Sequence, residues 1–449
     1  MKYHFIAIGG SVMSNLAVSL KNEGHHVSGS DDIIFEPSLS LLAKEGLLPS
    51  DFGWFPEKIT EELDAVFVGM HAKADNPELL RAKNLGLTVF SFPEYVYHRS
   101  QNKERIVIAG SHGKTTITAL LMHILKFHRY NFDYVIGAKV PGFETSVSLT
   151  DSANLILIEG DEYFTSPLDP KPKFLHYHHH IAVINGIAWD HANIYPDLEH
   201  YLNAFRSLSW STPKGGSLLG FKDDKLVKLL IGESEKSRED VFHQLYEPHP
   251  ARIRDGITYL KTEFGEYPIE IFGEHNLCNI SAAQAVCKRI GIRGKDFYAA
   301  LRGFKGADRR LQVRSQDANS AVFYDFAHAP SKAEATVAAV KNQFPKRKLV
   351  ACLELHTFSS LNKNFLPQYK NSLKKADIAA VFLRKELFDK KGLAAFSADE
   401  IRQAFGRKDI VVLENKNQLS DFVRTHRQAN VNLLLMSSGD FDGFDWQEI

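Results

Sequence analysis

The sequence has few cysteines, and those that it has are scattered. Cys278, Cys287 and Cys352 show no CxxC spacing, so we expect no disulfide framework, and this usage is typical of a reducing compartment. The chain also lacks an excess of either charge, because 54 Lys and Arg residues balance 54 Asp and Glu residues. Without a net field, nucleic acid and anionic membranes are not expected as partners.

Long apolar segments are missing as well. No apolar run is long enough to span a membrane, and the first residues have a strand pattern rather than that of a signal peptide. Internal repeats and low-complexity tracts are also absent. With 44% hydrophobic and 24% charged residues, the composition predicts an ordinary soluble protein, which we expect in the cytoplasm. At 449 residues the chain is too long for one core and predicts about three domains.

The stretch from residue 106 to residue 116 has the pattern of a phosphate-binding loop. Four apolar residues predict a buried strand, a turn reading Gly-Ser-His-Gly-Lys-Thr-Thr follows, and a helix is expected over 116–125. Such a turn directs backbone N–H groups and a helix N-terminus at one point, which suits a phosphate. Lys114 adds positive charge, and the Thr115 hydroxyl is suited to hold Mg²⁺. Because Ile108 stands where the strict pattern has glycine, an ordinary Gly-rich βα turn is the alternative.

The first region, about residues 1–99, begins like a dinucleotide-type βαβ unit, with a strand at 4–8 followed by Gly9-Gly10. The glycine fingerprint is incomplete, so an NAD site and a plain α/β turn both stay open. The further elements expected are a helix at 13–22, a strand at 26–30 that leads to Asp31, strands at 65–69 and 87–90, and a turn with a helix start at 75–78.

The central region, about residues 100–302, places polar residues at expected strand ends. A strand at 154–158 ends in Glu159, and an acidic residue there, beside a phosphate loop, is well placed to hold magnesium. A strand at 181–184 ends in Asn185, and Asp190-His191 follows shortly. Since parallel strands end at one edge of a sheet, these residues are expected to converge there.

Three other segments of the central region are less specific. In the run 178–180, three consecutive histidines point opposite ways in a strand, so a structural or substrate-side role is favoured over a metal site. The charged segment 234–239 is expected to be a solvated loop. Asn276 and Asn279, before an alanine-rich helix at 280–289, could share one helical face, and both helix capping and base recognition stay open.

The last region, about residues 303–449, has the pattern of a third open α/β sheet. Apolar strands separated by helices are expected there. The strands are 321–324, 349–353, 378–383 and 432–436.

These ordered segments resemble the Mur ligase family, the ATP-dependent amide-forming enzymes of cell-wall assembly. The matching segments are Gly110 to Thr116, Glu159-Gly160-Asp161-Glu162, Asp190-His191 and His275-Asn276-x-x-Asn279. The resemblance implies an α/β fold of three domains: a Rossmann-like domain that binds a UDP substrate (1–99), a central P-loop-type ATP-binding domain (100–302) and a Rossmann-like ligase domain (303–449).

Further segments resemble one branch of the family. Gly29-Ser30-Asp31 is similar to the members that handle muramate, and Lys173 to Tyr177 with Asp190 to Ile194 is similar to the members that use a tripeptide. The implied reaction joins UDP-N-acetylmuramate to L-alanyl-γ-D-glutamyl-meso-diaminopimelate, at the expense of ATP and with Mg²⁺, in peptidoglycan recycling. Arg206 stands roughly where several relatives carry a modified lysine, so no carbamylated lysine is expected.

The resemblance also implies a mechanism and residue roles. The muramate carboxylate attacks the γ-phosphorus of ATP, and the tripeptide amine then attacks the acyl phosphate; no general base stands out. The implied catalytic residues are Lys114, His191, Arg309, Asp325 and His328. The implied ATP contacts are Gly110, Ser111, His112, Gly113, Lys114, Thr115, Thr116, His275, Asn276, Asn279, Arg309 and Asp325. The implied metal ligands are Thr115, Glu159 and His191, the UDP-substrate contacts Gly9, Gly10, Ser11, Asp31 and Asn76, and the peptide contacts Lys173, His176, Tyr177 and Ser438.

Three alternatives remain at this point. A relative that uses free L-alanine would share nearly every ATP-site residue. A P-loop kinase or ATPase would form no amide, and an NAD-binding regulatory protein would not turn over ATP. UDP-N-acetylmuramate and a murein tripeptide are the expected partners, and the chain is expected to be a monomer or a weak homodimer.

Overall fold

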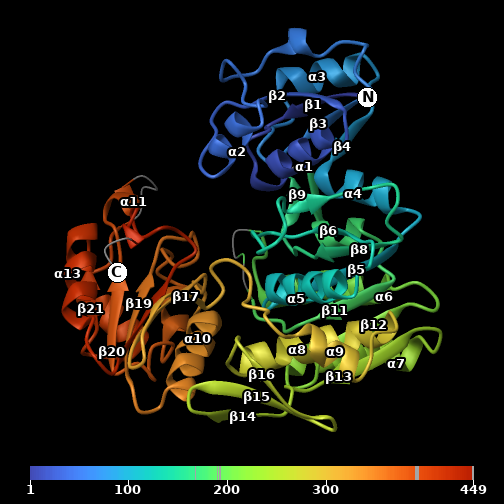
Figure 1. Cartoon of the computed structure of the whole chain (residues 1–449). Coiled ribbons are helices and arrows are strands. Elements are labelled where there is room, and N and C mark those ends of the chain that lie inside the picture. Colours follow the sequence, from blue (N-terminus) through green and yellow to red (C-terminus); the bar gives the residue numbers. More distant parts are fainter. Residues whose placement is uncertain (167, 190, 192–193, 390–393, 447–449) are drawn as a thin grey trace. The chain divides into compact units, whose positions relative to one another are not determined.

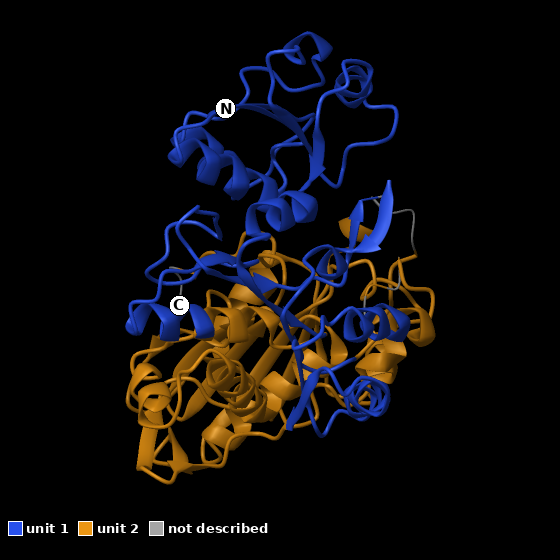
Figure 2. Ribbon diagram, turned by 90° about the vertical axis from the view of Figure 1, so that its right-hand side faces the viewer, with its two compact units in different colours: residues 1–110, 121–187, 202–245 blue, residues 111–120, 188–201, 246–449 orange. Residues whose placement is uncertain are grey.

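The structure is a computed structural model that describes residues 1–166, 168–189, 191, 194–389 and 394–446. It divides into two compact units, which Figure 2 colours separately. The first unit comprises residues 1–110, 121–187 and 202–245, and the second comprises residues 111–120, 188–201 and 246–449. Within the described residues, no helix is long and apolar enough to cross a membrane.

The first region forms a parallel sheet in the order β2-β1-β3-β4 (Figure 1). Its elements are β1 (Lys2–Ile6), α1 (Ser11–Asn22), β2 (His26–Ser30), α2 (Ser38–Lys44), the short 3-10 helix η1 (Pro56–Lys58), β3 (Ala65–Val68), α3 (Pro77–Asn84), β4 (Val89–Ser91) and α4 (Phe92–Ser100). Phe5 lies in register with Gly29 on one side and Phe67 on the other. A Cβ at Gly29 would lie 2.6 Å from Ile8 Cδ1, so only glycine lets the loop after β1 pack this closely.

A buried polar pair connects β1 of this sheet to α3. His4 Nε2 is 3.3 Å from Glu78 Oε2, and both side chains are fully buried. The other Glu78 oxygen accepts a hydrogen bond from the Phe55 N–H at 2.7 Å, and His4 Nδ1 is 2.9 Å from Ser28 Oγ. Burial alone would raise the pKa of Glu78, but the hydrogen bond from His4 and that from Phe55 outweigh it, so the pKa is lowered.

The central region carries a larger sheet in the order β13-β12-β11-β5-β8-β6-β7, with β5 in the middle. Its first elements are β5 (Glu104–Ala109), α5 (Lys114–Phe127), β6 (Asp133–Val135), β7 (Val147–Ser148), β8 (Leu155–Glu159), β9 (Phe164–Ser166), β10 (Asp169–Pro172), η2 (Lys173–His176) and β11 (Ile181–Ile184). Then follow α6 (Leu198–Trp210), β12 (Ser217–Phe221), α7 (Lys225–Ser237), β13 (Phe242–Tyr246), β14 (Ala251–Arg254), β15 (Ile257–Thr262), β16 (Gly265–Ile269), α8 (Glu274–Arg289) and α9 (Lys295–Ala300). The strands β5, β8 and β11 are almost continuously apolar, as expected for parallel strands covered on both faces.

The expected loop at 234–239 is wrong as far as residue 237, because α7 runs to Ser237. Asp224 caps this helix by accepting the N–H groups of Leu226 and Val227 at 2.9 and 3.0 Å. Ser234 is fully buried on the apolar face of α7, and its hydroxyl lies 2.9 Å from His243 Nε2. The helical period continued through a segment whose charge alone indicated a loop.

The last region forms a sheet in the order β17-β18-β22-β19-β20-β21, with only β17 antiparallel. Its elements are β17 (Gln312–Gln316), β18 (Ala321–Asp325), α10 (Pro330–Gln343), β19 (Lys348–Glu354), η3 (Leu366–Tyr369), β20 (Ile378–Phe382), α11 (Glu386–Asp389), α12 (Ala398–Phe405), β21 (Val411–Leu413), α13 (Lys416–His426) and β22 (Val431–Met436).

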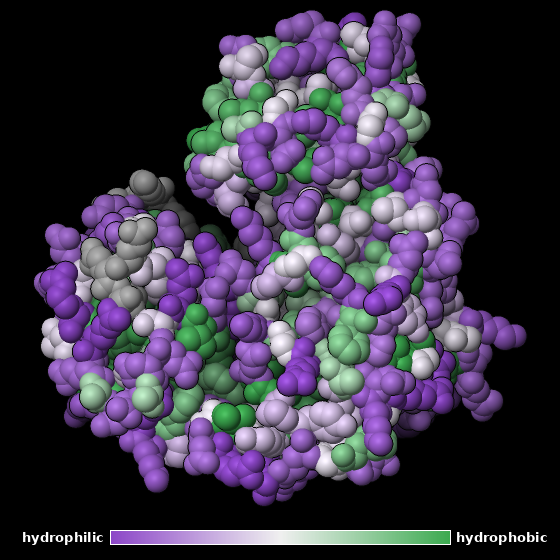
Figure 3. All heavy atoms as spheres, viewed as in Figure 1, coloured by the Kyte–Doolittle hydropathy of each residue, from purple (hydrophilic) through white to green (hydrophobic). Residues whose placement is uncertain are grey.

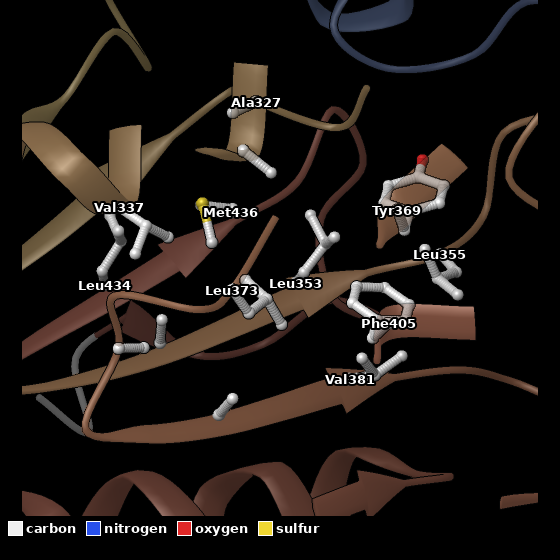
Figure 4. Close-up of a cluster of buried hydrophobic side chains, with 14 of the residues drawn as sticks. Ala327, Val337, Leu353, Leu355, Tyr369, Leu373, Val381, Phe405, Leu434 and Met436 are labelled. Carbon is white, nitrogen blue, oxygen red and sulfur yellow. The ribbon is translucent and has the colours of Figure 1, made fainter. Parts of the chain in front are cut away.

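Separate apolar clusters cover the two faces of this last sheet. One contains side chains of α10, η3 and α12, among them Val337, Tyr369 and Phe405, which Figure 4 shows against Leu353 and Val381 of the sheet. The other cluster joins α13 to the opposite face and includes the residues Phe441 and Phe444, which follow β22. The face of the molecule in Figure 3 is mostly polar, with apolar residues in small groups.

Candidate active site

The phosphate-loop pattern lies between β5 and α5, as predicted. Gly110 follows β5 with φ +118°, and a Cβ there would lie 2.6 Å from the backbone nitrogen of Asn185. Gly113, with φ +74°, precedes the first helical residue, Lys114. Both glycines therefore occupy backbone positions that other residues rarely adopt, and the loop delivers a helix N-terminus at the carboxyl edge of the sheet.

The side chain of Ser111 anchors this loop within the second unit. Its hydroxyl accepts a hydrogen bond from the Ala188 N–H at 2.9 Å and lies 2.9 Å from the Ala188 carbonyl and 2.8 Å from the Tyr201 hydroxyl. These partners use the hydrogen-bonding capacity of the hydroxyl. Ser111 would therefore contact a phosphate through its backbone N–H.

Glu159 ends β8 beside the strand that leads into the loop. It lies in register with Ile108 on β5, and its Oε2 accepts a hydrogen bond from the Gly137 N–H at 2.8 Å. Asn185, which follows β11, donates its backbone N–H to the Ala109 carbonyl at 3.0 Å. The expected convergence of the ends of β5, β8 and β11 at one sheet edge is therefore present in the first unit.

Within the second unit, an arginine reaches the beginning of α5. Arg310 Nη2 donates a hydrogen bond to Thr115 Oγ1 at 3.1 Å, and its guanidinium lies 4.7 Å from the centre of the Phe326 ring. Arg309, predicted as a nucleotide and catalytic residue, instead donates from Nη1 to the Gly439 carbonyl at 3.4 Å. His112 Nε2 lies 3.4 Å from Ser331 Oγ.

The predicted base-binding residues lie together at the start of α8. Asn279 donates from Nδ2 to Asn276 Oδ1 at 3.1 Å, and Asn276 Nδ2 donates to the Phe272 carbonyl at 2.8 Å. Both asparagines are buried on one helical face, as expected. Desolvation lowers the pKa of His275, and the nearby Asp325 carboxylate offsets part of that change.

The segment 325–328 is held by backbone contacts of Asp325. Its Oδ2 accepts the Leu311 N–H at 2.6 Å, and its Oδ1 accepts the Ala327 N–H at 2.7 Å. His328 Nδ1 lies 2.9 Å from the Phe326 carbonyl. Asp325 is thus a structural centre of this loop, and its predicted contact with ATP stays a prediction.

The residues predicted to hold the UDP substrate lie at the carboxyl ends of β1 and β2 and at the start of α3. Asp31 Oδ2 accepts the Gly9 N–H at 2.7 Å, and burial raises the pKa of Asp31. Gly10 is the N-cap residue of α1, which begins at Ser11. Asn76 caps α3 through the N–H groups of Glu78 and Leu79, which confirms the helix start expected at 75–78.

The residues predicted to contact the peptide follow the two-stranded sheet of β9 and β10. Lys173 Nζ pairs with Asp161 Oδ2 at 2.7 Å, and His176 Nε2 lies 2.9 Å from Asp169 Oδ2. Desolvation lowers the pKa of His176, with Lys171 acting in the same direction and Asp169 opposing. Tyr177 is almost fully buried, so it supports this segment from within.

The remaining histidine predictions concern residues that precede and follow β11 in the chain. His191 has a left-handed backbone with φ +57°, and its carbonyl accepts the N–H groups of Ile194 and Tyr195; Asp190, Ala192 and Asn193 lie outside the described residues. In the 178–180 run, His179 is buried with Nε2 2.9 Å from Thr212 Oγ1. The described residues contain no group of three or more His, Cys, Asp or Glu side chains arranged to hold a metal.

A second group of polar residues lies at the carboxyl ends of β19 and β22. Ser438, predicted as a peptide contact, has its Oγ 3.1 Å from His356 Nε2. Glu354 accepts hydrogen bonds from the Ser437 hydroxyl and from the Phe441 N–H, the latter at 3.1 Å. The sequence reasoning missed Glu354 and His356, although an acidic residue at the end of a strand was the signal used for Glu159.

Comparisons with known proteins bear on this arrangement. Three family descriptions match in order: the catalytic domain of the Mur ligase family over residues 2–103, the Mur ligase middle domain over 108–287, and the Mur ligase glutamate ligase domain over 309–439. A UDP-N-acetylmuramate–L-alanine ligase from Caldicellulosiruptor bescii is 31% identical over 386 residues, which are 84% of this chain and 82% of the relative. The chain belongs to the Mur ligase family.

The family assignment confirms two predictions. The fold is that of three Mur ligase domains, N-terminal, middle and C-terminal, built as mixed α/β structure. The chain is an enzyme, because Mur ligases are ATP-dependent ligases and its relatives are named as ligases. The boundaries predicted between the domains stay predictions.

Other relatives span almost the whole chain. A UDP-N-acetylmuramate–L-alanyl-γ-D-glutamyl-meso-2,6-diaminoheptandioate ligase from Escherichia coli is 27% identical over 451 residues, covering 99% of this chain and 96% of the relative. Among solved structures, a murein peptide ligase from Psychrobacter arcticus has a TM-score of 0.68 at 23% identity, covering 100% of this chain and 98% of its own. A UDP-N-acetylmuramate–alanine ligase from Thermotoga maritima has a TM-score of 0.70 at 22% identity, covering 98% of this chain and 96% of its own. These two structures support the fold.

Proposed function

We propose that the protein joins UDP-N-acetylmuramate to L-alanyl-γ-D-glutamyl-meso-diaminopimelate through an acyl phosphate formed from ATP. The observation that carries the ATP-dependent step is the loop from Gly110 to Lys114. It joins the central strand β5 to the N-terminus of a 14-residue helix. This geometry suits a triphosphate.

The first step brings two anions together, since a carboxylate attacks a phosphoryl group. Positive charge and N–H donors at the beginning of α5 would offset the developing charge, and Lys114 is the side chain proposed for that role. Arg310, which contacts Thr115, would add a second cation at the same place. Arg309, Asp325 and His328 are proposed to act with these groups when the third domain meets the nucleotide.

The side chains also fit a magnesium ion. Mg²⁺ prefers oxygen ligands and is usually held by one or two carboxylates together with substrate phosphates. The Thr115 hydroxyl and the Glu159 carboxylate supply such oxygens, and the ion would neutralise charge on the phosphates. His191 offers nitrogen, a poorer match for Mg²⁺; its proposed place on a second ion therefore needs its own test.

The choice of amine is supported by the charged residues around β9 and β10. Acidic and basic side chains alternate there, with Lys173 beside Asp161 and His176 beside Asp169. A tripeptide with several carboxylates and an ammonium group can exchange charged groups with more of these pairs than L-alanine can. Lys173, His176 and Ser438 are proposed as contacts, with Tyr177 as support.

A second candidate is the ligation of free L-alanine. It is favoured by relatives of 30–32% identity that are named UDP-N-acetylmuramate–L-alanine ligases, although each matches only about four-fifths of this chain. Under either candidate we propose that the UDP portion lies near Gly9, Gly10, Ser11, Asp31 and Asn76. The cytoplasm is the proposed compartment, because ATP is a substrate and Cys278, Cys287 and Cys352, all within the described residues, form no disulfide.

Product analysis tests the reaction class. Incubation with Mg-ATP, UDP-N-acetylmuramate and the tripeptide should give ADP, phosphate and an amide product in equal amounts. Mass spectrometry of the product and a coupled ADP assay measure them. ADP formation that is independent of the amine, or transfer of phosphate to a stable product, would move the protein to the ATPase or kinase alternative.

A further inference from the structure

A cavity of about 590 Å³ lies at the amino ends of β1, β3 and β4, within the first unit. Figure 1 marks this edge of the sheet with N, where β1 begins. Gly9 and Asp31, proposed to hold the UDP substrate, instead follow the carboxyl ends of β1 and β2. Because these strands are parallel, the cavity and the proposed substrate site lie at opposite edges of the sheet. Its volume is that of a small-molecule site.

Aromatic rings form the inner wall of this cavity. Tyr3 and Tyr95 are 5% and 2% exposed, and Phe90 is half-buried. The ring centre of Tyr95 lies 6.3 Å from that of Tyr3 and 5.5 Å from that of Phe90, and His25 extends the wall at 5.2 Å from Tyr3. The Arg99 guanidinium lies 6.0 Å from the centre of the Tyr95 ring. The wall therefore already accommodates a positive charge, as expected from the negative faces of aromatic rings.

Three carboxylates surround the mouth of the cavity. Glu23 follows α1, Asp64 precedes β3 and Asp151 follows β7. Arg99 Nη2 pairs with Glu23 Oε2 at 3.0 Å and with Asp151 Oδ1 at 3.2 Å, and Asp64 Oδ2 accepts the Lys2 N–H at 2.6 Å. Burial raises the pKa of Glu23 although Arg99 opposes that rise. The negative charge of Glu23 is therefore only partly compensated.

A buried ion pair holds one side of the mouth in place. Thr150 donates its backbone N–H and its hydroxyl to the two Asp133 oxygens, both at 2.9 Å, and its carbonyl accepts a hydrogen bond from Lys103 Nζ. Lys103 and Asp133 pair with each other, and their side chains are 5% and 0% exposed. Asp151, the next residue in the chain, is therefore presented on a fixed backbone, which lowers the entropy cost of binding a ligand.

We infer that this cavity binds an organic ammonium ion, with its cationic head against the aromatic wall and the carboxylates of the mouth around it. With the histidines neutral, the three carboxylates outnumber the two cationic groups, the Arg99 guanidinium and the Met1 amino group. A cation gains from both the ring faces and this excess negative charge, whereas an anion would have to displace Glu23 and Asp151 from Arg99. The inference goes beyond the proposed function and does not depend on it.

Three probes of nearly the same shape test the charge preference. Choline carries a trimethylammonium group, the alcohol with a tert-butyl group in its place is neutral, and the anion of tert-butylacetic acid is negative. Isothermal titration calorimetry of the full chain at constant ionic strength gives the Kd of each. Choline should bind about tenfold more tightly than the neutral alcohol, and the anion should bind most weakly.

Variants then place the probe in the cavity. Phe90→Leu should weaken choline binding about fivefold, and Phe90→Tyr, which keeps an aromatic face, should restore it. Asp64→Asn keeps an acceptor for the Lys2 N–H but removes a charge, so it should weaken binding about twofold to fivefold. Glu62→Gln is the matched control, because it removes the charge of an exposed partner of Lys2 that lies outside the cavity lining. It should leave the Kd of choline unchanged.

The outcomes decide the inference independently of the ligation reaction, since binding is measured without ATP, UDP-N-acetylmuramate or peptide. Equal Kd values for choline and the neutral alcohol, or no saturable binding of choline, would overturn it. Tighter binding of the anion would overturn it as well and assign the cavity to Arg99. Choline binding that Phe90→Leu and Glu62→Gln weaken equally would place the probe elsewhere and contradict the site. Circular dichroism checks that each variant is folded.

Discussion

The backbone of Gly110 passes so close to Asn185 that the ends of β5 and β11 have no room for a side chain between them. A Cβ on residue 110 would lie 2.6 Å from the Asn185 nitrogen and 2.9 Å from its carbonyl carbon. The left-handed φ of +118° excludes most other residues on conformational grounds as well. This approach sets where the loop leaves the sheet and where the N-terminus of α5 begins.

Gly110→Ala should therefore reduce stability and ATP binding by more than its backbone strain alone would. Strain at such a φ costs about 1–3 kcal/mol, and the contact with Asn185 adds to it because backbone cannot move aside cheaply. Gly265→Ala is the control, since Gly265 has φ +110° but no atom within 4 Å of the added Cβ. Chemical denaturation and ATP titration should show the larger loss for Gly110→Ala. Equal losses in the two variants would show that the close approach of Gly110 to Asn185 makes no contribution of its own.

Lys114→Ala should nearly abolish ligation. It removes a charge from a transition state that is rich in negative charge, and we expect kcat to fall by about a hundredfold or more. Lys126→Ala, at the other end of α5, serves as the control because that side chain donates to the Gly142 carbonyl, outside the loop. Turnover close to that of wild type in folded Lys114→Ala would refute the role of Lys114 in phosphate transfer.

His191→Ala should impair chemistry more than ATP binding, because the residue is proposed to hold a second ion near the acyl group. We expect a fall in the single-turnover rate with little change in the Kd of ATP, together with a shift in the Mg²⁺ dependence of the rate. A pure loss of ATP affinity with unchanged turnover would instead place His191 at the nucleotide.

The buried pair of His4 and Glu78 predicts a specific pH dependence of stability. The pKa of Glu78 in the folded state is below its ordinary value of 4.5. Its charge therefore contributes stability that is fully present above that value and is lost as pH falls through the lowered pKa. Glu78→Gln should reduce the free energy of unfolding by about 1–3 kcal/mol near neutral pH. Urea denaturation across the acid range should show this difference shrinking below about pH 4.5; a constant difference would exclude an ionised Glu78.

Much of the fold could be predicted from local patterns. The strands at 26–30 and 181–184 have the predicted bounds, since each is a short apolar or alternating run with clear ends. The helix after the phosphate loop begins at Lys114, two residues earlier than expected, because the loop residues themselves take helical geometry. Residues 234–237 were misread because their charges lie on the exposed side of a helix whose other side is buried.

The site could be predicted only where the sequence carries a motif. Gly110, Lys114 and Glu159 stand in recognisable order, and their positions at strand and helix ends followed from it. Glu354 and His356 have no motif, since their contacts with Ser437 and Ser438 depend on the pairing of β22 with β19 in the middle of the sheet. Likewise, it was not predictable that Arg310 rather than Arg309 would contact Thr115, because both residues are arginines and their side-chain directions depend on left-handed backbone at Arg309 and Leu311.

The central claim is that the enzyme uses a tripeptide rather than a free amino acid. The most direct test is kcat/KM for L-alanyl-γ-D-glutamyl-meso-diaminopimelate and for L-alanine, measured with the same preparation at saturating Mg-ATP and UDP-N-acetylmuramate. The account predicts a clear preference for the tripeptide, and a larger rise in KM for tripeptide than for ATP in Lys173→Met. Equal or faster turnover with L-alanine would contradict the claim and make the protein a muramate–alanine ligase with the same ATP site.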